Sequence, residues 1–263
     1  MALRMLRSAT EALYVRRLTR ALDGGPRPRH VAILLDADGR GDRGTGQTGT
    51  GHTAAGSRAG GAKIRDVLRW CDAAGIRHVT VWVLPDDTSA HRTPDRSGPL
   101  SGVVEETVAC MCTADEDWRI EVAGPLDRLP EETVRTLEEA VARTASRTGL
   151  SVGVAVGRSG RSEIVDTVRA AFRQHVSAGG DPRDLAEDFD LPDLSGHLRF
   201  PAPAGDADFV IRTSAEQRLS GFLLRQPASG EVHFVEVLWP DFRRTDLLRA
   251  LRSYAARDRG HDA

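Results

Sequence analysis

Six short apolar runs alternate with segments of helical periodicity, and this alternation most constrains what the chain can fold into. The runs, which predict buried strands, span residues 30–35, 79–84, 118–122, 150–156, 209–211 and 232–237. The helical segments span residues 60–74, 103–111, 130–147, 162–175 and 245–256. Because helices separate the strands and tight hairpin signals are lacking, we expect one α/β domain with a parallel sheet covered on both faces.

The bulk properties of the chain exclude several classes of protein. A formal charge of −2 and a pI near 6.5 give no electrostatic case for a nucleic-acid partner. No run approaches the length of a membrane span, and the N-terminus lacks a continuous apolar signal core. The three cysteines form no C-x-x-C pair, which favours a reduced, cytoplasmic setting.

The N-terminal segment alternates leucines and arginines over residues 3–22. We therefore divide the chain into an amphipathic helix at residues 1–25 and the main domain at 26–263. Packing on its own domain is the expected role of this helix, and contact with an anionic membrane surface is the alternative.

Polar residues directly follow the predicted strands. Asp36 to Arg40 follow the first strand, Asp86 and Asp87 the second, and Arg212 begins a polar run after the fifth. Because ligands of parallel sheets bind beyond the carboxyl ends of the strands, we expect these side chains to share one rim. Arginines and a close-approach glycine suit a phosphate, and carboxylates beside a diphosphate suit Mg²⁺.

The same residues resemble the cis-prenyltransferases, the undecaprenyl diphosphate synthase family. The stretch DFVIRTSAEQRLSGFLLRQPASGEVHFVEVLWPDF at 208–242 resembles the C-terminal signature of that family, and HVAILLDADGR at 30–40 resembles its opening motif. The match extends from about residue 28 to 254. Within the family, the sequence most resembles the short-chain actinobacterial cis-farnesyl diphosphate synthases. The resemblance implies a six-stranded parallel sheet with a hydrophobic tunnel, acting as a homodimer.

The implied enzyme is a magnesium-dependent prenyltransferase that condenses isopentenyl diphosphate with an allylic diphosphate to give a cis product. By resemblance, the catalytic aspartate and metal ligand is Asp36, Glu231 completes the magnesium site from the neighbouring subunit, and Thr88 takes a second catalytic position. The residues that the resemblance places on the substrates are Ala37, Asp38, Gly39, Arg40, Ser57, Asp87, Arg212, Arg218, Leu219 and Ser220.

The departures from the family pattern fall on one side of this site. The family's Gly-Asn after the catalytic aspartate is Ala37-Asp38, its phosphate-binding histidine is Ser57, and its asparagine is Thr88. Each lost donor to a diphosphate could remove about 1.5–3 kcal/mol. The isopentenyl half of the site is therefore expected to be intact and the allylic half altered.

Three alternatives stay open at this point. The altered half would suit an enzyme of the same fold that couples isoprenoids irregularly, and it would also suit a catalytically weak partner subunit in a heteromer. Residues 44–53 fit G-x-G-x-x-G and nearly fit a P-loop, but they do not directly follow a strand, so nucleotide binding is disfavoured.

Overall fold

A computed structural model describes residues 2–34, 54–83, 97–124, 126, 129–156, 160–181, 183, 207–213, 230–237 and 239–258. The strands are β1 (His30–Leu34), β2 (His78–Trp82), β3 (Arg119–Ala123), β4 (Ser151–Ala155), β5 (Phe209–Thr213) and β6 (Glu231–Val235). The helices are α1 (Ala2–Leu22), α2 (Ala54–Ala73), α3 (Ser97–Met111), α4 (Glu131–Thr144), α5 (Gly160–Ser177) and α8 (Arg244–Asp258), with a short 3-10 helix η6 (Trp239–Asp241).

The six strands form one sheet in the order β3-β4-β2-β1-β5-β6. All five neighbouring pairs are parallel, as the alternation of strands and helices predicts. The helix predicted at 60–74 begins earlier, at Ala54. The last residues of the glycine-rich segment at 40–56 therefore belong to α2. The rest of that segment, including the candidate nucleotide loop at 44–53, lies outside the described residues.

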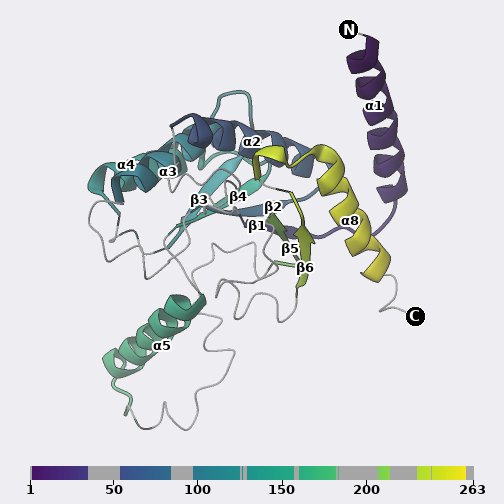
Figure 1. Cartoon of the computed structure of the whole chain (residues 1–263). Coiled ribbons are helices and arrows are strands. Elements are labelled where there is room, and N and C mark those ends of the chain that lie inside the picture. Colours follow the sequence, from purple (N-terminus) through teal and green to yellow (C-terminus); the bar gives the residue numbers. More distant parts are fainter. Residues whose placement is uncertain are drawn as a thin grey trace, which may run out of the picture.

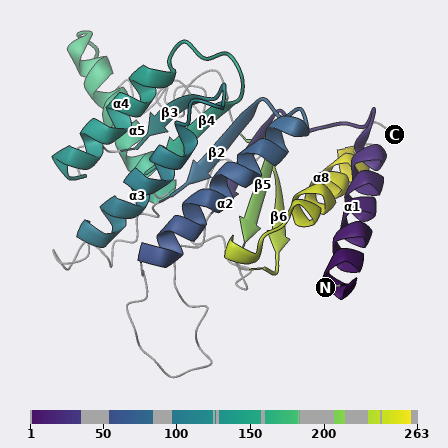
Figure 2. The ribbon, with the colours of Figure 1, turned by 90° about the horizontal axis from the view of Figure 1, so that it is seen from above.

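The two faces of the sheet are covered differently. Figure 2 shows α2, α3, α4 and α8 over one face, where the main hydrophobic core lies, and Figure 1 shows α5 on the other side, standing away from the sheet. Side chains alternate between the faces along each strand. In β5, Phe209 and Ile211 therefore belong to the main core, whereas Val210 belongs to a smaller cluster on the opposite face.

The N-terminal helix α1 lies alongside α8 (Figures 1 and 2). Leu18 and Leu22 of α1 are buried in the main core, and the Tyr14 hydroxyl accepts a hydrogen bond from Arg249 of α8 at 3.2 Å. The buried face of α1 thus packs on the rest of the chain. No helix in the described part of the chain is long and apolar enough to cross a membrane.

A polar network fixes the amino edge of the sheet. The Asp208 carboxylate accepts hydrogen bonds from the backbone N–H groups of Arg29 and His30, at 2.7 and 2.9 Å. The His30 Nε2 and Thr80 Oγ1 atoms are 2.8 Å apart in a buried hydrogen bond between β1 and β2. A Cβ at Gly153 would lie 3.0 Å from that hydroxyl, so a glycine keeps the space open. His30 opens a family-like motif, but its described contacts hold two strands in register.

Candidate diphosphate-binding site

The predicted site segments follow directly after the strands, at the edge of the sheet that the carboxyl ends of the strands form. Leu34 of β1 pairs in register with both Trp82 of β2 and Arg212 of β5, so these strands end at one level. Trp82 in turn pairs with Ala155 of β4. The segments that follow these strands therefore all leave from the same edge, as a shared rim requires.

Arg212 is the charged side chain that the fold buries at this edge. It is 7% exposed, and no other Lys, Arg, Asp or Glu in the described part of the chain is as buried. Alternation along β5 places it on the face of Val210, opposite the main core. Burying a guanidinium away from water is costly unless charge and hydrogen bonds compensate. A buried arginine at a ligand-binding edge is therefore a strong candidate for holding an anion.

The backbone beside Arg212 is held by its neighbour. The Thr213 side chain is fully buried, and its hydroxyl lies 3.4 Å from the Leu34 carbonyl oxygen of β1. The strand pairings on both sides of β5 add further restraint. The Arg-Thr pair thus combines a cation with a residue that ties its strand to the next one, which favours a preorganised anion site.

The N-terminus of α2 is directed to the same edge. Because α2 connects parallel strands β1 and β2, it begins at the carboxyl edge and runs back to the amino edge. Ser57 lies in its first turn. Unpaired backbone N–H groups and the helix dipole make such a terminus favourable for a phosphate. Ser57 is thus in a segment that could hold a phosphate, and its predicted role in binding the substrate stays a prediction because the structure does not describe its side chain.

Glu231 does not share this rim within one chain. It opens β6 and pairs in register with Phe209, so it lies at the amino edge of the sheet. Its Oε1 atom is 2.9 Å from Arg257 Nη1 of α8, on the face of the main core. Glu231 and Arg212 are thus at opposite edges and on opposite faces. Within one protomer the two groups therefore do not meet at one rim, and the contribution of Glu231 from a neighbouring subunit stays a prediction.

The other predicted site residues lie outside the described part of the chain, and their roles stay predictions. They are Asp36, Ala37, Asp38, Gly39, Arg40, Asp87, Thr88, Arg218, Leu219 and Ser220. Among the described residues, no three His, Cys, Asp or Glu side chains cluster to hold a metal ion.

Sequence reasoning did not single out the contribution of Thr213 or of the Asp208 carboxylate. The available signal was a polar residue flanking an apolar strand run, since such residues must find partners when buried.

Comparison with known proteins agrees with this geometry. A family model described as "Putative undecaprenyl diphosphate synthase" matches residues 38–262. An isoprenyl transferase 2 of Streptomyces coelicolor is 47% identical over 97% of each chain. A (2Z,6E)-farnesyl diphosphate synthase of Thermobifida fusca is 45% identical over 97% of this chain and 98% of its own.

A solved structure extends the likeness to three dimensions. The lavandulyl diphosphate synthase of Lavandula x intermedia, crystallised with dimethylallyl diphosphate, superposes with a TM-score of 0.73 at 28% identity. The superposition covers 87% of this chain and 95% of that one. With a matching family model, relatives that align over nearly its whole length and the same parallel fold, the chain belongs to the undecaprenyl diphosphate synthase family of prenyltransferases.

Proposed function

We propose that this chain condenses isopentenyl diphosphate with an allylic diphosphate and forms a cis double bond in the product. The observation that carries the proposal is the buried Arg212 at the carboxyl edge, inside a motif shared with isoprenyl transferases. A buried guanidinium at the edge of the sheet where α2 begins suits a diphosphate, and the family membership supplies the reaction class.

The proposed reaction balances without a redox partner. The allylic C–O bond breaks and the leaving diphosphate keeps the electron pair. The double bond of isopentenyl diphosphate then attacks the allylic carbon, and loss of a proton leaves the new cis double bond. Cations around the leaving diphosphate would stabilise the developing negative charge.

Two groups of residues divide the substrates in this proposal. Arg212, Arg218 and Ser220, with Leu219 between them, would hold isopentenyl diphosphate. The residues assigned to the allylic half are Asp36, Ala37, Asp38, Gly39, Arg40, Ser57, Asp87 and Thr88. Arg212 and Ser57 belong to elements that meet the same edge of the sheet, so the two groups are compatible with adjacent diphosphates.

Magnesium is the cofactor that this set of donors would take. Asp36 and Glu231 offer carboxylate oxygens, which Mg²⁺ prefers together with substrate phosphate oxygens. The ion would neutralise diphosphate charge and so assist departure of the leaving group. Glu231 would leave its ion pair with Arg257 to act in such a site.

A homodimer would resolve the position of Glu231. Four apolar side chains of α5, namely Val165, Val168, Phe172 and Val176, are each between 39% and 45% exposed. Their spacing places them on one side of the helix, and Figure 1 shows α5 away from the sheet. An apolar helix face of this kind favours burial against a second copy. A second copy could then bring its own Glu231 to this subunit's carboxyl edge.

We also propose a cytoplasmic location with peripheral contact at an anionic membrane surface. The described cysteines Cys71, Cys110 and Cys112 are free thiols, as a reducing compartment would keep them. On α1, Leu13 is 65% exposed and shares its face with three exposed arginines, Arg16, Arg17 and Arg20. A basic face with an apolar side chain suits the interface of an anionic bilayer.

A short product is favoured by the relative from Thermobifida fusca, whose name specifies a (2Z,6E)-farnesyl product. In that product the newest double bond is cis and the older one trans, so geranyl diphosphate would be the acceptor. The lavandulyl diphosphate synthase structure holds dimethylallyl diphosphate, which makes that compound the second acceptor to test.

The decisive experiment incubates the purified chain with labelled isopentenyl diphosphate and Mg²⁺, adding dimethylallyl, geranyl or farnesyl diphosphate in turn. We expect turnover with geranyl diphosphate and a fifteen-carbon cis product. A parallel reaction with dimethylallyl diphosphate alone tests irregular coupling. Tight binding of isopentenyl diphosphate without turnover with any acceptor would contradict the proposal and favour the partner-subunit alternative.

A further inference from the structure

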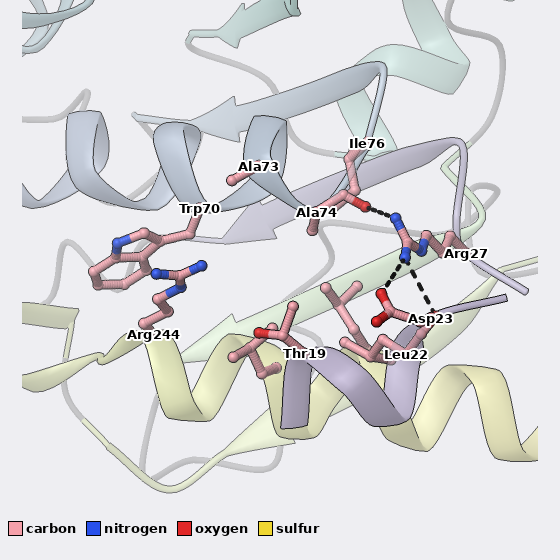
Figure 3. A pocket seen from close by; sticks show the side chains of 11 residues that line it. Thr19, Leu22, Asp23, Arg27, Trp70, Ala73, Ala74, Ile76 and Arg244 are labelled. Carbon is pink, nitrogen blue, oxygen red and sulfur yellow. Dashed lines mark hydrogen bonds and ion pairs between the residues drawn. The ribbon is translucent and has the colours of Figure 1, made fainter. Parts of the chain in front are cut away.

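A cavity of about 140 Å³ lies between α1, α2 and α8 (Figure 3). Arg27 and Ile76 in its wall lie just upstream of β1 and β2, which begin at His30 and His78, so the cavity lies toward the amino edge of the sheet. Arg212 lies at the other edge and on the face away from these helices. The cavity is therefore distinct from the candidate diphosphate-binding site.

The wall of the cavity is mainly apolar. Leu22, Ile76, Leu248 and Leu251 line it, and each is at most 4% exposed. The half-buried indole of Trp70 closes one end (Figure 3). An apolar cavity of about 150 Å³ is large enough to hold benzene. An apolar group of five or six carbon atoms would therefore fit.

The Arg27 end of the cavity has its charge already satisfied. Arg27 Nη1 donates to the Ala74 carbonyl at 2.7 Å, and Nη2 donates to the Leu22 carbonyl at 3.3 Å. Asp23 adds an ion-pair contact at 3.7 Å (Figure 3). Arg27 thus joins the C-terminal ends of α1 and α2, and its donors face carbonyls and a carboxylate rather than the cavity.

The Trp70 end carries positive charge that is not paired in this way. Arg244 lines the cavity there, and it has no hydrogen bond or ion pair within the described part of the chain. Lys63, the only lysine in the sequence, places its Nζ atom 6.0 Å from the Trp70 ring centroid. Arg244 is also the first residue of α8, whose first turn carries Asp246, and that carboxylate already accepts a hydrogen bond from the Arg243 N–H at 2.9 Å. Arg244 therefore supplies a positive charge at one end of an apolar cavity.

We propose that this cavity binds a small amphipathic anion, with a branched apolar group of five or six carbons inside and a phosphate or carboxylate at Arg244. Three helices that are far apart in sequence would contact this molecule. Binding would therefore tie α1 to α2 and α8, and it does not depend on the proposed reaction.

The test is calorimetric titration of the full chain with 3-methylbutyl phosphate and with 3-methylbutanoate. Inorganic phosphate and 3-methylbutanol serve as head-only and tail-only probes. All titrations are repeated with saturating isopentenyl diphosphate, which fills the isopentenyl half of the proposed catalytic site without an acceptor to react with. We expect at least one intact amphiphile to bind about ten-fold more tightly than either part, because both halves of the cavity then contribute.

The matched variants are Arg244→Gln and Arg243→Gln, which remove the same charge from neighbouring exposed positions. Arg244→Gln is expected to weaken binding about ten-fold, whereas Arg243→Gln, which does not line the cavity, leaves it unchanged. In hydrogen exchange, the bound amphiphile should slow exchange in residues 10–22 of α1. Equal affinity in the two variants, or an amphiphile that binds no better than inorganic phosphate, overturns the proposal.

Discussion

Mixing two inactive variants would reveal whether Glu231 acts across a subunit boundary. In one chain, Glu231 is level with Phe209, three residues before Arg212 on the neighbouring strand. At about 3.3 Å per residue and 4.8 Å between strands, the Cα atoms of Glu231 and Arg212 are about 11 Å apart. Their side chains also leave opposite faces of the sheet. The Glu231 carboxylate reaches little more than 3–4 Å from its Cα, which is about one bond length per side-chain atom. It therefore cannot reach, within one chain, a ligand that Arg212 holds on the other face of the sheet.

The perturbation is a pair of single substitutions, Asp36→Ala and Glu231→Ala, made in separately purified chains. Each variant alone lacks one proposed magnesium ligand at every site and should be nearly inactive. In a mixed dimer, one site would combine the intact Asp36 of one subunit with the intact Glu231 of the other. Equal amounts that pair at random give about half mixed dimers, each with one complete site of two. The expected rate is therefore about one quarter of the wild-type rate.

The assay measures incorporation of labelled isopentenyl diphosphate after subunit exchange. The control for exchange itself is a mixture of wild type with the variant that carries both Asp36→Ala and Glu231→Ala. Native mass spectrometry of chains with different tags gives the fraction of mixed dimers, by which the rate is divided. Activity equal to the sum of the two unmixed variants, despite measured exchange, would refute action across the boundary. A monomer at assay concentration would refute the dimer directly.

Three further predictions test other parts of the structure. Arg212→Gln should raise the KM for isopentenyl diphosphate about ten-fold or more while changing that for the allylic substrate far less, measured by initial rates; equal effects would contradict the division of the site. Burial raises the pKa of Cys71 to about 12, so a thiol reagent at pH 8 should label the more exposed Cys110 first, and a Cys110→Ser variant should lack the fastest phase. Burial and, to a smaller extent, Arg257 lower the pKa of His233 in the folded chain. Below the ordinary histidine pKa of 6.5 the unfolded chain therefore binds more protons, and the free energy of unfolding in urea should fall as the pH drops. The fall should be smaller in His233→Asn.

The sheet could be predicted from the sequence because its signal is strong and local. Short, mainly apolar runs between helical segments leave few alternatives to a buried parallel strand, and every predicted strand overlaps an observed one. Helix starts were less predictable. The α2 helix begins at Ala54, inside a glycine-rich run, because packing of the later turns outweighs the weak helix propensity of glycine.

For the site, the sequence could predict only which residues lie at the ends of the strands. Arg212 lies at the carboxyl edge as expected, although β5 continues through Arg212 and Thr213 instead of ending at residue 211. Glu231 opens its strand, as the predicted strand at 232–237 already suggested, and the order of residues within a strand decides which edge each one reaches. Its partner Arg257 comes from the last helix, and no spacing in the sequence could indicate that contact. The sequence pattern specifies elements, whereas contacts between elements depend on how the elements pack.

The proposed division of the site into two halves is compatible with where Arg212 lies in the fold. Arg212 belongs to a strand with hydrogen-bonded neighbours on both sides, and Thr213 ties that strand to β1. A change at Arg212 would leave a buried space or an unpaired group, so a stability cost accompanies any functional one. The departures from the family pattern at Ala37, Asp38 and Thr88 follow the last residues of β1 and β2 in the sequence. Segments that connect strands to helices are in general more variable than the strands. We therefore propose that acceptor choice diverges at these positions while the isopentenyl half is retained, so the acceptor series, rather than isopentenyl diphosphate binding, is expected to distinguish this chain from its relatives.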